Sequence, residues 1–166
     1  MFARAPALAT NELPFFGAYL LLASTALALA QGDLVADALA AIQWVRSHAQ
    51  EYGGDPARIF LVGSSAGAYL AVDAVNARAS GIAGVVGRYG YYGSLRPLLA
   101  IHGENDLLVP AVRAREFVER MRARSSHPAR YGELPGGHHD FDLYESIRSN
   151  AVSIAVERFI TAAEPC

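Results

Sequence analysis

A chain of 166 residues has the length of one globular domain. Hydrophobic residues make up 52% of the chain and charged residues 18%, and this balance excludes an intrinsically disordered protein. The formal net charge of −2 excludes the strongly basic surface of a typical nucleic-acid-binding protein, and the single cysteine excludes both an internal disulfide and a cysteine-based metal cage.

The first predicted element is an apolar segment over residues 15–30, inside a stretch that carries no charged residue. We interpret it as an apolar N-terminal helix that either packs on the protein or contacts a membrane, because a membrane-spanning helix needs about 20 such residues. A cleaved signal peptide fits less well, since Glu12 precedes the apolar run and Pro14 lies at its edge. Residues 1–32 are therefore treated as a separate segment, and both a cytoplasmic and a membrane-associated location stay open.

From Asp33 onward the hydrophobic pattern alternates between helix and strand. Asp33 can cap a helix that Gly53 and Gly54 end. Strands are predicted over residues 59–62, 82–89, 98–102 and 130–134, and further helices over residues 65–78, 112–124 and 143–162. The last helix is expected to bury Leu143, Ile147, Ala151, Ile154 and Phe159. This alternation predicts one α/β domain over residues 33–166, with a mostly parallel sheet of about four strands flanked by helices.

A G-x-S-x-G motif directly follows the first of these strands and opens the next helix. It consists of Gly63, Ser64, Ser65, Ala66 and Gly67. The glycines let the chain reverse sharply, so that Ser65 projects as a nucleophile at the helix N-terminus. The free N–H of Ala66 can then stabilise an oxyanion. A plain Gly/Ser-rich turn is the alternative interpretation.

A nucleophilic serine needs a base, and the base needs an orienting acid. Two later loops follow strand ends, where open α/β sheets place their ligands. The first carries Asp106, our candidate acid; the second carries His139, our candidate base, with His138 as the alternative. Glu104 and Asp140 are weaker candidates for the acid.

The histidine loop could also bind a metal, because histidine and carboxylate side chains suit zinc. Its candidate ligands are His138, His139, Asp140 and Asp142. No second, distant set of ligands accompanies this cluster, so we expect neither a metal nor an organic cofactor. Tyr89 is expected either to touch substrate or to belong to the core.

Three stretches of the sequence resemble α/β-hydrolase esterases of the hormone-sensitive-lipase-like type. EYGGDPARIFLVGSSAGAYLA is similar to their nucleophile region, HGENDLLVP to their acid loop, and ELPGGHHDFD to their histidine loop, with His139 in the catalytic position. Actinobacterial membrane-associated carboxylesterases, whose N-terminal parts are hydrophobic, are the most similar group. The resemblance implies a partial α/β-hydrolase fold and hydrolysis of short acyl esters through an acyl-enzyme, with a small-molecule ester as substrate.

The family's second oxyanion donor comes from an upstream Gly-rich loop, and no such loop precedes Gly53. Two alternatives to an active esterase therefore stay open: a catalytically impaired remnant that oligomerises or contacts a membrane, and a serine peptidase of the prolyl-oligopeptidase type. The resemblance also implies that one edge of the nucleophile strand has no neighbouring strand. An exposed strand edge promotes aggregation unless something covers it. We expect either residues 15–30 or a second copy of the chain to cover it.

Overall fold

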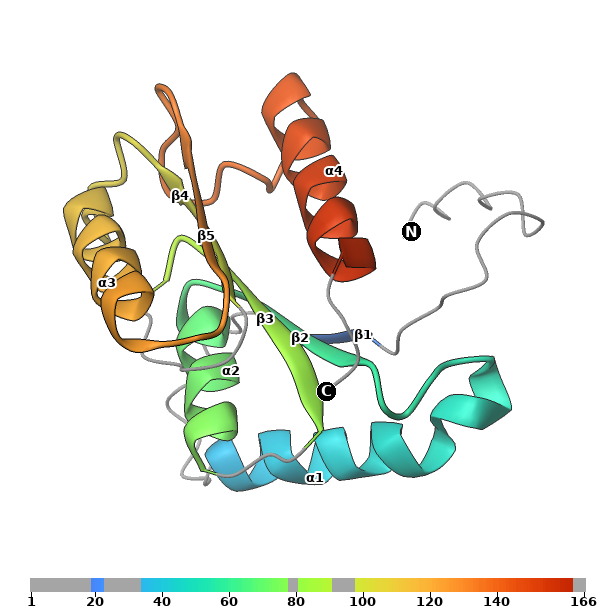
Figure 1. Cartoon of the computed structure of the whole chain (residues 1–166). Coiled ribbons are helices and arrows are strands. Elements are labelled where there is room, and N and C mark those ends of the chain that lie inside the picture. Colours follow the sequence, from blue (N-terminus) through green and yellow to red (C-terminus); the bar gives the residue numbers. More distant parts are fainter. Residues whose placement is uncertain (1–18, 23–33, 78–80, 91–97, 163–166) are drawn as a thin grey trace.

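A computed structural model of the chain describes residues 19–22, 34–77, 81–90 and 98–162. These residues form a parallel sheet with helices on both faces (Figure 1). The elements in chain order are β1 (Tyr19–Leu22), α1 (Leu34–His48), the short 3-10 helix η1 (Ala49–Tyr52), β2 (Ile59–Ser64), α2 (Ala66–Asn76), β3 (Ile82–Arg88), β4 (Leu98–Gly103), α3 (Ala111–Arg124), β5 (Ala129–Leu134) and α4 (Ile147–Ala162).

The strands lie in the sheet in the same order as in the chain, and every neighbouring pair is parallel. The carboxyl ends of β2, β3, β4 and β5 therefore meet at one edge of the sheet. The predicted fold class, a partial α/β-hydrolase fold with a parallel sheet flanked by helices, is confirmed.

Two apolar layers hold the helices against the sheet. In the first, α1, α2 and α3 cover one face, with Ile59 and Leu61 of β2 pointing toward them. In the second, α4 covers the opposite face and packs on Phe60 and Val62. All residues of β2 are buried, and consecutive residues from Ile59 to Val62 alternate between the two layers. These four residues are all apolar, as expected for a strand covered on both sides.

The N-terminal apolar segment differs from its prediction where the structure describes it. Tyr19–Leu22 form a strand, not part of a helix, and they pair in parallel with residues 60–63 of β2. A short run that is apolar on all sides cannot be assigned to helix or strand by periodicity, and here the open edge of β2 decides the outcome. The segment covers that edge as one of our two alternatives predicted, and the rest of residues 15–30 lies outside the described residues.

The last helix begins four residues later than predicted, at Ile147. Ser146 caps it reciprocally with Ser149: each hydroxyl accepts the backbone N–H of the other residue, at 3.1 and 2.8 Å. The predicted buried face was also wrong in part, because Leu143, Ile147, Ala151 and Ile154 are exposed. The residues of α4 that pack on the sheet are Val152, Phe159 and Ile160.

No helix in the described part of the chain is both long enough and apolar enough to cross a bilayer. Most of residues 15–30, for which we expected a possible membrane contact, lie outside the described residues.

Candidate active site

Ser65 lies in the sharp turn between β2 and α2. Its backbone has φ 51°, a conformation that is strained for a residue other than glycine. The turn is so tight that a Cβ on Gly63 would lie 2.2 Å from the carbonyl oxygen of Gly67. The backbone N–H of Ser65 donates to the carbonyl of Arg88 at the end of β3, at 2.9 Å. The close approach of the two backbones explains why residue 63 is a glycine.

Replacing Gly63 by alanine is expected to destabilise the protein by about 3 kcal/mol, because the new methyl group would collide with backbone atoms that have no room to move. The matched control is Gly132→Ala in β5, where nothing lies within 4 Å of an added Cβ. Urea unfolding at pH 7 measures both. Equal stability of the two variants would contradict this account of the turn.

His139 lies between Ser65 and Asp106. Its Nε2 atom is 3.1 Å from Ser65 Oγ, and its Nδ1 atom is 2.8 Å from Asp106 Oδ2. A carboxylate only accepts hydrogen bonds, so the proton of neutral His139 belongs on Nδ1, and Nε2 then accepts from the Ser65 hydroxyl. The His139 side chain is 11% exposed and that of Asp106 is buried. The three residues form the hydrogen-bonded chain that nucleophilic serine chemistry requires.

Asp106 is held as a carboxylate by several donors. Its Oδ1 atom accepts the backbone N–H groups of Leu108 and Val109, at 2.9 and 2.8 Å. Its Oδ2 atom lies 3.2 Å from Nε2 of buried His102, whose nearer partner is the carbonyl of Val109 at 2.7 Å. Burial raises the pKa of Asp106, but the hydrogen bonds from Val109, His139 and Leu108 outweigh it and hold the pKa below its ordinary value. Asp106 therefore stays negatively charged beside His139 at neutral pH.

The acid loop and the histidine loop are joined by hydrogen bonds. Asn105 N–H donates to the carbonyl of Gly137 at 2.8 Å, and Gly136 N–H donates to the carboxylate of Glu104 at 2.9 Å. The backbones approach so closely that a Cβ on Gly103 would lie 2.6 Å from the Gly137 oxygen. Glu104, a weaker candidate for the acid, thus has a role in joining the loops.

The remaining candidates lie around this chain of three. His138 is exposed and its Nδ1 atom lies 3.2 Å from the carbonyl of Asn105, so the geometry favours His139 as the base. Asp140 has one carboxylate oxygen 3.8 Å from His139 Nε2. Ala66 is the first residue of α2, so its N–H has no partner one turn earlier in the helix and is available to an oxyanion.

The contacts between Tyr89 and Asp142 were not foreseen from the sequence. The Tyr89 ring lies edge-on to the His139 ring, with 4.7 Å between centroids, and its hydroxyl donates to Asp142 at 2.6 Å. Asp142 also forms an ion pair with Arg88. The one available signal is the position of Asp142, three residues after the candidate base, but the sequence pattern suggests it only as a metal ligand.

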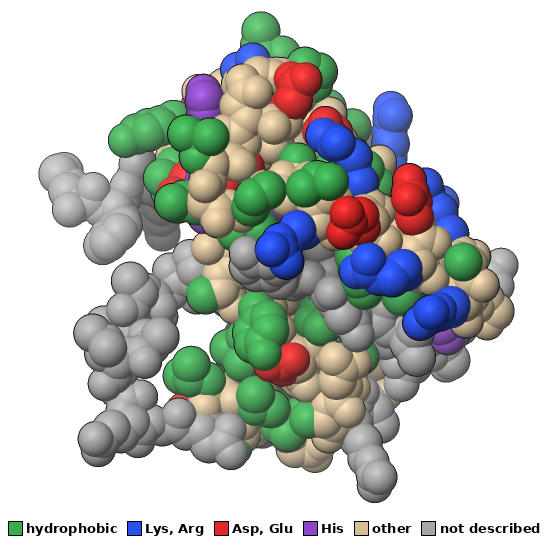
Figure 2. Space-filling view, turned by 90° about the vertical axis from the view of Figure 1, so that its left-hand side faces the viewer, with side chains coloured by type: hydrophobic (Ala, Val, Ile, Leu, Met, Phe, Trp, Pro, Cys, Tyr) green, Lys and Arg blue, Asp and Glu red, His purple; other side chains and the backbone are tan. Residues whose placement is uncertain are grey.

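Exposed apolar side chains adjoin both loops. Leu107 and Leu108 directly follow Asp106, and Leu143 and Tyr144 come shortly after His139. Figure 2 shows hydrophobic side chains gathered on the upper part of one face, next to a histidine. Exposed apolar side chains therefore lie in the same two loops as Asp106 and His139.

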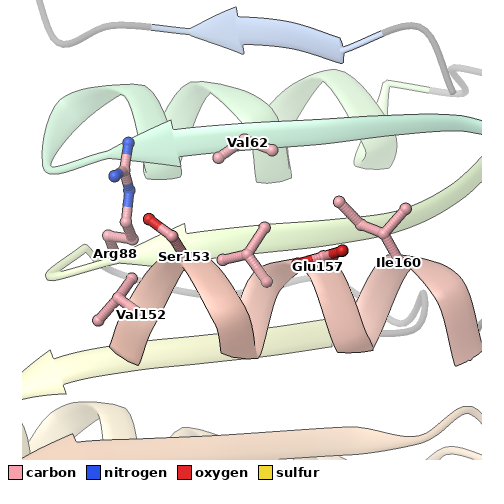
Figure 3. Close-up of a pocket in the computed structure, with 7 residues that line it drawn as sticks. Val62, Arg88, Val152, Ser153, Glu157 and Ile160 are labelled. Carbon is pink, nitrogen blue, oxygen red and sulfur yellow. The ribbon is translucent and has the colours of Figure 1, made fainter. Parts of the chain in front are cut away.

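A groove of about 390 Å³ lies elsewhere, on the face of the sheet that α4 covers. Figure 3 shows its lining, which comes from the middle of β2, the end of β3 and one side of α4: Val62, Arg88, Val152, Ser153, Val156, Glu157 and Ile160. None of the three hydrogen-bonded site residues lines it. Among the described residues, no group of three or more histidine, cysteine, aspartate or glutamate side chains is arranged to hold a metal ion.

Comparisons with known proteins agree on one fold. A truncated carbohydrate esterase from gut microbiota superposes with a TM-score of 0.69, over 91% of this chain and 88% of that one, at 15% identity. Propionate-bound esterase 2 of Thermogutta terrifontis superposes with a TM-score of 0.64 at 22% identity, covering 80% of this chain and 66% of the esterase. Residues 32–92 match a family described by its α/β hydrolase fold. The chain has the α/β-hydrolase fold.

The curated relatives that this chain resembles are named as esterases. It is 30% identical to LipM of Mycobacterium tuberculosis, named a probable carboxylic ester hydrolase, over 77% of this chain. It is 44% identical to the esterase LipC of the same organism, over 39% of this chain. The resemblance to α/β-hydrolase esterases that the three motifs indicated is thereby confirmed. The chain spans less than half the length of two of these relatives: 42% of LipM and 43% of the esterase LipQ of the same organism.

Proposed function

We propose that the chain is a serine hydrolase that cleaves short acyl esters through an acyl-enzyme. Ser65 Oγ attacks the ester carbonyl while His139 Nε2 takes its proton, and Asp106 orients the imidazole and stabilises its positive charge. The alcohol leaves with the proton that His139 returns. Water, activated by His139 in turn, then releases the acid. The observation that carries this proposal is the hydrogen-bonded chain Ser65–His139–Asp106, with distances of 3.1 and 2.8 Å.

The Ala66 N–H supplies one donor to the tetrahedral oxyanion. The N–H of Ser65 itself is engaged by the carbonyl of Arg88. Loss of one oxyanion donor lowers the rate by about 10²–10³-fold in serine hydrolases. We therefore expect slow turnover unless a second donor reaches the site, and activated esters such as p-nitrophenyl acetate and butyrate are the appropriate first substrates.

A fluorophosphonate probe tests the proposal directly, because it labels an activated serine with little demand on substrate fit. The full chain is expected to be labelled on the peptide that contains Ser65, as read by mass spectrometry, and the Ser65→Ala variant is expected to stay unlabelled. A folded wild-type chain that remains unlabelled would contradict the proposal and favour the catalytically impaired remnant. Faster cleavage of a p-nitroanilide than of the matching p-nitrophenyl ester would favour the peptidase.

A further inference from the structure

The carboxyl end of the histidine loop is anchored to the end of β3. Asp142, whose side chain is 9% exposed, accepts the Tyr89 hydroxyl on one carboxylate oxygen and pairs with the Arg88 guanidinium through the other. The amino end of the same loop is held by the acid loop, through the carbonyl of Gly137. His139 thus lies between two anchors, one on each side of it in the chain.

Tyr89 is held in place independently of Asp142. Its φ is 40°, in the left-handed region, and its backbone N–H donates to Ile101 in β4 at 2.8 Å. The next residue, Gly90, lies so close to α2 that an added Cβ would be 2.4 Å from the Ala68 methyl group. The Tyr89 ring packs edge-on against both His139 and Phe141, at 4.7 and 5.0 Å between centroids. The Tyr89 ring therefore forms a rigid wall on one side of the His139 imidazole.

Arg88 connects the serine to the histidine loop. Its carbonyl accepts the N–H of Ser65 at 2.9 Å, while its guanidinium pairs with Asp142. One residue therefore contacts both the nucleophile turn and the loop of the base. A shift of the end of β3 would move both together and preserve the distance between Ser65 and His139.

We propose that Asp142 is a positioning residue that, through Tyr89 and Arg88, fixes the His139 imidazole at hydrogen-bonding distance from Ser65. This inference rests on the proposed function, for which His139 is the base. Misplacing a catalytic group by about 1 Å can lower the rate by about 10²-fold, whereas substrate binding changes little when the substrate itself touches none of the altered groups.

The Tyr89 hydroxyl suits this role at any pH used for assay. Burial, and then its hydrogen bond to the Asp142 carboxylate, raise the pKa of Tyr89 to about 12. The phenol therefore remains a donor to Asp142 over the neutral range.

Two variants and two matched controls test the role. Asp142→Asn removes the charge with almost no change of shape, and Tyr89→Phe removes the hydroxyl but keeps the ring. The controls Glu145→Gln and Tyr52→Phe make the same changes at exposed positions, the first on the same loop and the second on η1. With p-nitrophenyl butyrate we expect kcat to fall about 10–100-fold in Asp142→Asn and Tyr89→Phe, with KM within about twofold of wild type. The controls are expected to keep both constants.

Two further measurements separate positioning from a merely structural role. The double variant is expected to lose no more kcat than the more severe single variant, because both changes break the same hydrogen bond. Proton NMR detects the Nδ1 proton of His139 at low field. We expect this signal in wild type and in the controls. In the two variants we expect it to be lost or broadened by exchange. The NMR readout needs no catalysis, so it tests positioning even if wild type proves inactive, which would count against the proposed function alone. Variants with wild-type kcat, or with an unchanged Nδ1 proton, would overturn the inference.

Discussion

The variant His139→Ala is expected to lower kcat/KM for p-nitrophenyl butyrate by about 10⁴–10⁶-fold, because the Ser65 hydroxyl loses the only group within 3.1 Å that the described structure offers as its base. Ser65→Ala is expected to cause a loss of the same size. The double variant should be no worse than either single one, since the two residues act as a unit and removing one already disables the other.

His138→Ala is the matched control for this experiment. It removes an identical side chain from the neighbouring position, where the imidazole is exposed and contacts the carbonyl of Asn105. We expect activity within about threefold of wild type, because rearranging one exposed loop contact costs about 1 kcal/mol or less in most proteins. A large loss in His138→Ala together with a small loss in His139→Ala would reverse our assignment of the base.

The second large effect is expected for Asp106→Asn, with a fall in kcat of about 10⁴-fold. The reason lies in the partners of the carboxylate. The oxygen that accepts the N–H groups of Leu108 and Val109 must remain an oxygen, so the amide nitrogen of the variant faces His139. A donor at that position forces the imidazole proton onto Nε2. Nε2 can then no longer accept a hydrogen bond from the Ser65 hydroxyl. Glu104→Gln, in the same loop, is the control and is expected to keep most of the activity.

The same variant gives a prediction for the pH dependence of stability. Because the pKa of Asp106 is lower in the folded protein than in the unfolded chain, its charge stabilises the fold above the unfolded pKa of about 3.9, and this contribution is lost as pH falls through the folded pKa. Between pH 7 and pH 3, the free energy of unfolding in urea should therefore fall further for wild type than for Asp106→Asn. An equal fall in both would show that Asp106 is not held as a carboxylate by its neighbours.

Much of the fold could be predicted from the sequence because the pattern is local and strong. Residues 59–62 are apolar and lead directly into the G-x-S-x-G motif, so the place of this strand in a parallel sheet could be inferred. Gly53 likewise ends the first helical region with φ 75°, as its type suggested. The structure brings Ser65, Asp106 and His139 together because each follows a strand of the same parallel sheet.

The features that could not be predicted depend on contacts between distant residues. Tyr19–Leu22 form a strand because the edge of β2 is open to them, and nothing within the apolar run itself distinguishes strand from helix. The anchoring of Asp142 depends on Arg88 and Tyr89, more than 50 positions earlier in the chain. The start of α4 is the exception, because Ser146 and Ser149 are a local capping signal from which it could have been predicted.

The agreement between strand order in the sheet and strand order in the chain has a consequence for biosynthesis. A ribosome delivers the serine turn first, then the end of β3 that holds Ser65, then the acid loop, and the histidine loop only after β5. Domains generally fold as units, and an unfinished sheet gains one neighbour with each strand that emerges. A nascent chain that stops before β5 lacks His139, so under the proposed function its serine has no base.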